Sequence, residues 1–162
     1  MKIIAVIGAG TMGNGIAHVF AQHHYKVHLI DTNEKALVKA LETIEVNLDR
    51  MITKEILTVD LKWQTLQNIH TFIDLESGVV HADLVIEAVT ENISVKLDMF
   101  KKLGEICSPQ TILTSNTSSI SITKLASVVP NPNRVIGMHF MNPVPVMKLV
   151  EIINGYATKQ EV

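Results

Sequence analysis

The chain has 162 residues, of which 47% are hydrophobic and 19% charged, and its 14 Lys and Arg against 16 Asp and Glu leave a net charge of −2. This length predicts one domain with a sizeable core, and the hydrophobic content excludes disorder. No basic stripe could neutralise phosphates, and no apolar run approaches the ~18 residues of a membrane span. We therefore expect neither nucleic acid nor a membrane as a partner.

The first predicted elements in chain order are a strand, a helix and a second strand. Lys2–Ile7 is apolar and rich in β-branched residues, which is typical of a strand covered on both faces. Thr11–Gln22 is predicted to be a helix, and Val27–Ile30 a second strand that ends at Asp31. A unit of this length implies a right-handed crossover and parallel pairing of the two strands.

Two helical segments follow the second strand. Asn33 is suited to cap a helix over Glu34–Met51, whose apolar residues recur at helical spacing. Lys54–Asn68 predicts a second helix or a helix–loop piece that returns to the sheet. The rest of the chain alternates further strands (Ile69–Phe72, Leu84–Ala88, Thr111–Thr114, Val135–His139, Met147–Ile153) with helices (Ser94–Ile106, Ile120–Ala126). This alternation predicts an open α/β sheet in one domain over residues 1–162.

Cysteine and histidine give little sign of a metal site. Cys107 is alone, so neither a disulfide framework nor a thiolate metal site is expected. Four histidines gather near the first helix and the second strand without an acidic or Cys partner at ligand spacing, and we predict that they lie at a solvated helix end: His18, His23, His24 and His28. The apolar start of the chain leads into a glycine loop, so we expect no signal peptide and predict a cytoplasmic protein with no metal.

Gly8-Ala9-Gly10-Thr11-Met12-Gly13 follows the first strand and opens the first helix, which is the context that gives a G-x-G-x-x-G pattern meaning. Gly8 would permit the tight turn, Gly10 the approach of a pyrophosphate, and Gly13 close packing of helix on strand. Asp31, 18 residues after Gly13, could accept both ribose hydroxyls of NAD and repel the extra phosphate of NADP. The alternative is a plain tight turn, with Asp31 capping the next helix.

A second constellation lies near the end of the chain. His139 ends a buried strand, at the sheet edge where α/β proteins bind ligands, and a neutral imidazole there could abstract a hydroxyl proton. Glu151 comes twelve residues later, after Pro143 and Pro145. If its segment runs back alongside, the carboxylate would orient the imidazole. The alternative is a hydrogen-bonded structural histidine.

Two further clusters follow predicted strands. Ser115–Ser119 is rich in donors and acceptors, and its alternative role is to cap the helix near Ile120. Glu91 follows the strand Leu84–Ala88, with Lys96 about one helical turn beyond it. The alternative for Glu91 is a carboxylate that complements the helix dipole.

Four runs together resemble the L-3-hydroxyacyl-CoA dehydrogenases, notably the short-chain bacterial 3-hydroxybutyryl-CoA type: GAGTMG at Gly8–Gly13, VIEAVTEN at Val85–Asn92, SNTSS at Ser115–Ser119 and GMHFMNPVPVMKLVE at Gly137–Glu151. The resemblance implies a Rossmann-type, doubly wound, mostly parallel sheet with a helical insertion after the second strand. It also implies NAD-dependent oxidation of the 3-hydroxyl of an acyl-CoA to a ketone.

The resemblance also assigns roles. His139 matches the catalytic base and Glu151 its acidic partner; Ser118, Asn142 and Lys54 match substrate-side positions, with Lys54 near the CoA. The cofactor side comprises Gly8, Gly10, Thr11, Met12, Gly13, Asp31, Glu91, Lys96, Asn116 and Asn142.

Members of this family continue into a helical C-terminal domain, whereas this chain ends at Val162. We therefore expect the NAD-binding domain alone, with a homo-oligomer or a separate helical partner as the possible assemblies. Two alternatives follow: a nucleotide-binding module without activity of its own, or a β-hydroxyacid dehydrogenase that acts without CoA. Many of the latter use a lysine base, so the HFMNP run with Glu151 favours the CoA family.

Overall fold

A computed structural model describes residues 2–162 of the chain. In chain order the elements are β1 (Ile3–Ile7), α1 (Thr11–Gln22), β2 (Lys26–Ile30), α2 (Glu34–Thr53), α3 (Val59–Gln67), β3 (Ile69–Phe72), α4 (Leu75–Val79), β4 (Leu84–Glu87), α5 (Ile93–Ile106), β5 (Ile112–Ser115), α6 (Ile122–Ala126), a 3-10 turn η1 (Pro132–Arg134), β6 (Val135–Phe140) and β7 (Val150–Asn154).

The strands form one seven-stranded sheet in the order β3-β2-β1-β4-β5-β6-β7. The first six strands pair in parallel, and only β7 runs antiparallel to its neighbour β6. The predicted doubly wound, mostly parallel α/β sheet is therefore confirmed. The strand order reverses between β1 and β4, and in such sheets ligands bind in the crevice beyond the carboxyl ends of the strands at this point.

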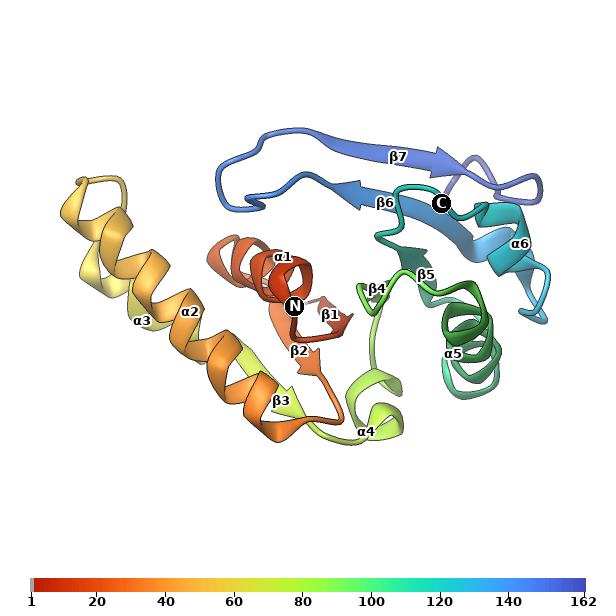
Figure 1. The fold of residues 1–162 in the computed structure, drawn as a ribbon, viewed down its shortest axis with the longest axis horizontal. Helices are drawn as coiled ribbons and strands as arrows, with labels where there is room; N and C mark the ends of the chain where they lie inside the picture. The colour runs from red at the N-terminus through yellow and green to blue at the C-terminus, as the bar shows by residue number, and fades with distance from the viewer. Residues whose placement is uncertain (1) are drawn as a thin grey trace.

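Helices cover the two faces of the sheet in two groups. Along β1, Ile4 and Val6 point into a core shared with α1 and α2, while Ala5 and Ile7 point into a second core shared with α5 and α6. All four side chains are almost completely buried. Figure 1 shows α1, α2 and α3 gathered around β1 to β3, and α5 and α6 beside β5 and β6. Both faces of β1 are covered, which explains its continuous apolar run.

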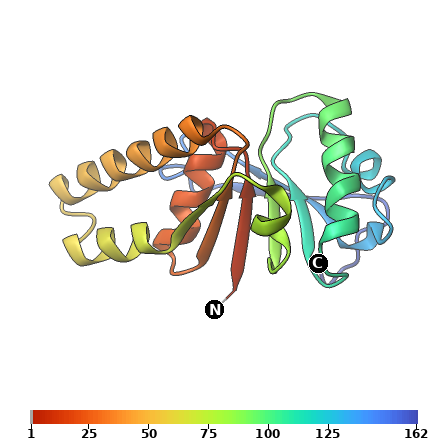
Figure 2. The same cartoon turned by 90° about the horizontal axis from the view of Figure 1, so that it is seen from below.

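The helical insertion after the second strand is confirmed as two helices, α2 and α3, which Figure 2 shows lying side by side and projecting from the sheet. Asn33 caps α2, its side chain accepting from the Lys35 N–H, and Thr58 caps α3 in the same way. The piece expected over Lys54–Asn68 is thus a turn followed by a nine-residue helix.

Most predicted boundaries lie within one or two residues of those in the structure, the start of β7 differs by three, and one helix was missed. The last strand begins at Val150 rather than Met147, because Val146 and Met147 donate backbone hydrogen bonds to the Pro143 carbonyl in a turn. The sixth helix begins at Ile122 rather than Ile120, because Ser121 is its cap. Helix α4 was not predicted: its five residues are too few to show helical periodicity.

The histidine prediction is half wrong. His23 and His24 are exposed, but His18 in α1 and His28 in β2 are buried. Within residues 2–162 no group of three or more His, Cys, Asp or Glu side chains could hold a metal ion. In the same part of the chain, no helix has the length and apolar character needed to cross a membrane.

Candidate functional site

The glycine loop connects β1 to α1 at the carboxyl edge of the sheet. Gly8 has φ +102°, and a Cβ there would lie 2.6 Å from the Ala88 carbonyl oxygen. A Cβ on Gly13 would lie 1.6 Å from the Gly8 carbonyl oxygen. A side chain at either position would force the backbone apart, so the tight turn and the close approach of helix to loop both depend on glycine.

Helix α1 begins without a side-chain cap, its N-cap being Gly10. Each of the other α-helices has a capping side chain: Asn33, Thr58, Asp74, Asn92 or Ser121. A Cβ on Gly10 would meet no heavy atom within 4 Å, so this glycine borders open space. Free amides and a positive helix end beside open space fit the pyrophosphate of a dinucleotide.

Asp31 follows β2 and lies beside the glycine loop. Its Oδ2 accepts the Ala9 N–H at 2.9 Å, and its Oδ1 accepts the Asn33 N–H at 2.9 Å. The alternative that Asp31 caps α2 is not what the structure shows, because Asn33 is the cap. The partly exposed carboxylate instead fastens the glycine loop to the end of β2, where a dinucleotide fold holds the ribose.

His139 and Glu151 are brought together by the β6–β7 pair. The two residues face each other in the antiparallel register, and His139 Nδ1 lies 2.8 Å from Glu151 Oε2. The side chains are 21% and 51% exposed, so the pair is open to a ligand. With Nδ1–H donating to the carboxylate, Nε2 is left as the proton acceptor. The expectation that the Glu151 segment runs back alongside His139 is confirmed.

A cavity of about 340 Å³ lies beside His139 and reaches Met12 in the first turn of α1. It joins residues from α1, α5, the end of β6 and the β4–α5, β5–α6 and β6–β7 connections, which lie far apart in the sequence. Its lining includes seven of the predicted site residues: Met12, Glu91, Lys96, Asn116, Ser118, His139 and Asn142. The imidazole and the first turn of α1 therefore border one crevice.

The residues of the Ser115–Ser119 loop make different contacts. The Asn116 side-chain oxygen accepts the Phe140 N–H at 2.8 Å, which fixes the backbone directly after His139. Thr117 is buried and its hydroxyl accepts the Ile120 N–H at 3.0 Å, so it shapes the loop. Ser118 is exposed in the cavity wall. No residue of this loop caps α6, since that role belongs to Ser121.

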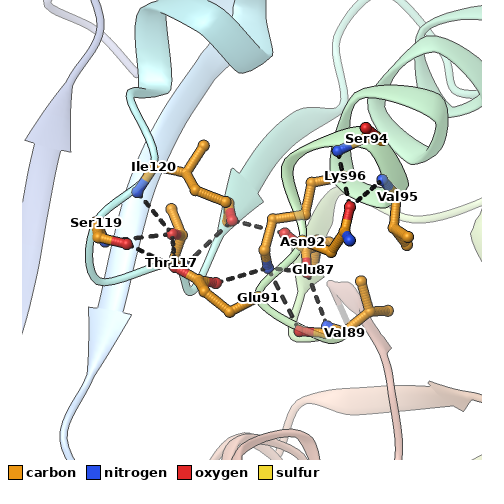
Figure 3. A network of polar contacts seen from close by, with 11 residues as sticks. Glu87, Val89, Glu91, Asn92, Ser94, Val95, Lys96, Thr117, Ser119 and Ile120 are labelled. Atoms are coloured by element: carbon orange, nitrogen blue, oxygen red, sulfur yellow. Dashed lines mark hydrogen bonds and ion pairs between the residues drawn. The ribbon is translucent and has the colours of Figure 1, made fainter.

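Figure 3 shows the polar contacts that join the β4–α5 loop to the β5–α6 loop. The Glu91 carboxylate accepts hydrogen bonds from the hydroxyls of Thr117 and Ser119 and lies 3.4 Å from Lys96 Nζ. Partial burial alone would raise the pKa of Glu91, but the Thr117 hydroxyl and the Lys96 charge lower it overall. Asn92, not Glu91, caps α5. Glu91 is thus an ionised group held at the cavity wall.

Sequence reasoning missed the role of Glu87 and a second cavity. Glu87 is buried and accepts a hydrogen bond from the buried Ser115 hydroxyl. The sequence feature that could have indicated Glu87 is an acidic residue at the end of an apolar strand, nine residues before Lys96. The second cavity, of about 420 Å³, lies between α1, α2 and the β6–β7 connection, and its lining includes Gly10, Thr11, Lys39, Thr43, Asn47, Asn142 and Val144. Lys54, exposed at the C-cap of α2, lines neither cavity.

Comparison with known proteins gives consistent matches. The family description "3-hydroxyacyl-CoA dehydrogenase, NAD binding domain" matches residues 3–162. The chain is 48% identical to the 3-hydroxyadipyl-CoA dehydrogenase of Escherichia coli, covering 100% of this chain and 34% of that protein. It is also 48% identical to a probable 3-hydroxybutyryl-CoA dehydrogenase of Bacillus subtilis, covering 99% of this chain and 56% of that protein.

Among solved structures, the crystal structure of a 3-hydroxybutyryl-CoA dehydrogenase from Escherichia coli is similar with a TM-score of 0.96 at 48% identity, covering 99% of this chain and 34% of that one. The enzyme PaaH1 from Ralstonia eutropha gives the same TM-score at 43% identity and is covered to 56%. The chain thus spans between about a third and just over half of the length of these relatives.

Proposed function

The chain belongs to the 3-hydroxyacyl-CoA dehydrogenase family, matching its NAD-binding domain, and on that premise we propose that it carries the nucleotide-binding part of an enzyme that oxidises the 3-hydroxyl of a short-chain L-3-hydroxyacyl-CoA to a ketone. The observation that carries this proposal is the His139–Glu151 contact of 2.8 Å beside a cavity shared with the glycine-loop helix. A base that faces a dinucleotide-binding turn is what removal of a hydroxyl proton together with a hydride requires.

On the cofactor side, the uncapped start of α1 and the open side of Gly10 would receive the pyrophosphate of NAD. Asp31 would accept from the ribose hydroxyls. The nicotinamide end would reach the cavity lined by Met12, Glu91, Lys96, Asn116 and Asn142. When bound, NAD supplies the hydride acceptor.

On the chemical side, His139 takes the hydroxyl proton at Nε2, because Nδ1–H is engaged by Glu151. The carboxylate holds the ring in that tautomer and offsets the charge that the imidazolium gains. Asn116 steadies the base through the Phe140 N–H. Ser118 and Asn142, both exposed at the cavity, would hydrogen-bond the reacting oxygen.

The substrate's CoA portion would follow the α2 side of the second cavity, which shares Asn142 with the first, beside the Gly10 end that would receive the NAD pyrophosphate. Lys39, Thr43 and Asn47 line it from α2 and provide a cation, a hydroxyl and an amide for a phosphate-bearing ligand. Lys54 lies farther along the same insertion and would contact the nucleotide end of CoA. Assembly with a second copy or a helical partner domain, and a cytoplasmic location, stay predictions.

The test is a steady-state assay of acetoacetyl-CoA reduction by NADH, run beside a titration of NADH binding by fluorescence. Turnover with acetoacetyl-CoA but not with free acetoacetate supports the proposal. Turnover of acetoacetate alone would favour the β-hydroxyacid alternative, and NADH binding with turnover of neither would favour a module without activity of its own. Absence of NADH binding would overturn the proposed function.

A further inference from the structure

Glu87 is the last residue of β4 and is completely buried, as the only charged residue in an otherwise apolar strand. Its backbone pairs with Ile7, directly before the glycine loop, and its carbonyl accepts the Asn116 N–H at 2.8 Å. The residue thus lies at the point where the strand order reverses, between the glycine loop and the Ser115–Ser119 loop. It does not line the cavity beside His139.

The Glu87 carboxylate has three protein donors. Oε1 accepts from Lys96 Nζ at 2.6 Å and from the Val89 N–H at 2.7 Å, and Oε2 accepts from the Ser115 hydroxyl at 2.6 Å. Figure 3 shows Glu87 beside Lys96, with dashed contacts joining its carboxylate to Lys96 and Val89. Both carboxylate oxygens therefore have hydrogen-bond donors although the side chain is completely buried.

Lys96 is as buried as Glu87, and its two carboxylate partners are Glu87 and Glu91. Its side chain is 1% exposed, and it lies in the first turns of α5, where the helix dipole repels positive charge. A buried ion pair contributes little to stability compared with apolar residues of the same volume, so folding alone gives little reason for this pair. The ammonium nevertheless reaches the cavity wall, within 3.4 Å of Glu91 Oε2 and of the Val89 carbonyl.

We propose that Glu87 is a positioning residue that fixes the Lys96 ammonium at the wall of the cofactor cavity and, through Lys96, holds Glu91 there. This inference rests on the proposed function, since it concerns how the cavity wall is prepared for NAD. Glu87 touches neither cofactor nor substrate. Glu87 contributes by preorganisation. Without the Glu87 charge, Lys96 has only the half-exposed Glu91 as a counter-ion, and the cavity wall loses its fixed geometry.

The test is a double-mutant cycle on the full 162-residue chain, with Glu87→Gln, Lys96→Met and the double variant. Each variant is measured for NADH dissociation constant by fluorescence titration and for Tm. We expect Glu87→Gln to weaken NADH binding by on the order of 10-fold, as removal of a hydrogen bond to a charged group does. In the Lys96→Met background the same change should have little further effect on NADH affinity, because the group that Glu87 positions is already gone.

The Tm values separate positioning from a structural role. Glu87→Gln leaves a buried cation without its partner and should lower Tm, whereas the double variant removes both charges and should recover most of that loss without recovering NADH affinity. Thr114→Val is the matched control: it removes a buried hydroxyl without a partner from β5, one residue before Ser115, and should leave NADH affinity unchanged.

Two results would overturn the proposal while the wild-type chain binds NADH. One is wild-type affinity in Glu87→Gln at a temperature where the variant is folded. The other is that Glu87→Gln lowers NADH affinity by the same factor in the wild-type chain and in the Lys96→Met chain. If the unsubstituted chain itself fails to bind NADH, the proposed function fails, and the positioning role fails with it.

Discussion

His139 and Glu151 occupy opposite places on the only antiparallel strand pair of the described sheet, and their side chains meet at 2.8 Å. The parallel strands deliver His139 to the carboxyl edge, and β7 returns from the proline turn to place the carboxylate beside it. The proposed acid–base pair therefore depends on one hairpin, and the glycine loop on a separate βαβ unit.

Replacing His139 by Gln tests the base directly. In a form of the protein that turns over acetoacetyl-CoA, we expect turnover to fall by roughly 10²–10⁴, since the proton acceptor is lost. NADH affinity should stay nearly intact, because the glycine loop is untouched. Steady-state kinetics and NADH titration measure the two effects, with Glu151→Gln as the companion variant, expected to lower turnover less. Turnover that survives the His139 change would show that another group is the base.

The glycine loop offers a matched pair of substitutions. Gly13→Ala would drive a Cβ into the Gly8 carbonyl, and we expect it to lower the free energy of unfolding by roughly 1–3 kcal/mol or more and to abolish NADH binding. Gly10→Ala meets no protein atom and should fold normally while weakening NADH binding. Thermal melts and NADH titrations measure both. Wild-type stability in Gly13→Ala would contradict the packing argument.

Stability should fall in acid because of His18. Burial lowers the pKa of His18 to about 4 from its ordinary value of 6.5, and the nearby Gln22 side chain offsets this only in part. Between these values the unfolded chain binds a proton that the folded chain does not. Protonation of His18 therefore does not reduce the free energy of unfolding above pH 6.5. The free energy of unfolding declines by up to roughly 3 kcal/mol as pH falls toward 4.

Urea unfolding of the wild type and of His18→Leu across this pH range measures the effect. The variant should lose this part of the pH dependence, whereas the contribution of His28, whose pKa burial also lowers, should remain. An identical slope in the two proteins would exclude His18 as the source.

Arg134 is a buried cation that stabilises the end of α5. Its guanidinium donates to the carbonyls of Ser108, Thr111 and Gly104, the last two at 3.2 and 3.5 Å. Arg134→Met would remove a donor from each of these carbonyls, although Ser108 keeps the Thr111 N–H, and should reduce the free energy of unfolding by roughly 2–4 kcal/mol in urea titrations. Arg50→Met on the exposed side of α2 is the control and should change it by less than about 0.5 kcal/mol. Similar losses in the two variants would argue against the capping role.

Most elements could be predicted because their signals are local. Each signal is contained in one continuous stretch of the chain. Examples are the β-branched run of β1, the helical spacing in α2 and the cap at Asn33. Helix α4 could not be predicted, since five residues show no period and its cap, Asp74, resembles any turn residue. The late start of β7 escaped because apolar residues continue through the turn after Pro143.

The site divides in the same way. Gly8, Gly13 and Asp31 could be named from spacing within one βαβ unit, whereas Glu87 could not, because its importance comes from Lys96 on a helix and Ser115 on another strand. The burial of His18 could not be predicted either, because the packing of α1 on the sheet decides which face of the helix lies in the core.

By itself, the sequence determined the α/β class, the dinucleotide turn and the residue types of the proposed acid–base couple, because each depends on order along the chain. Only the tertiary structure decided that His139 faces Glu151 and that Glu87 closes on Lys96. Both contacts depend on strand register and on helix packing over the sheet. A slip of one residue between β6 and β7 would turn the carboxylate to the opposite face of the sheet.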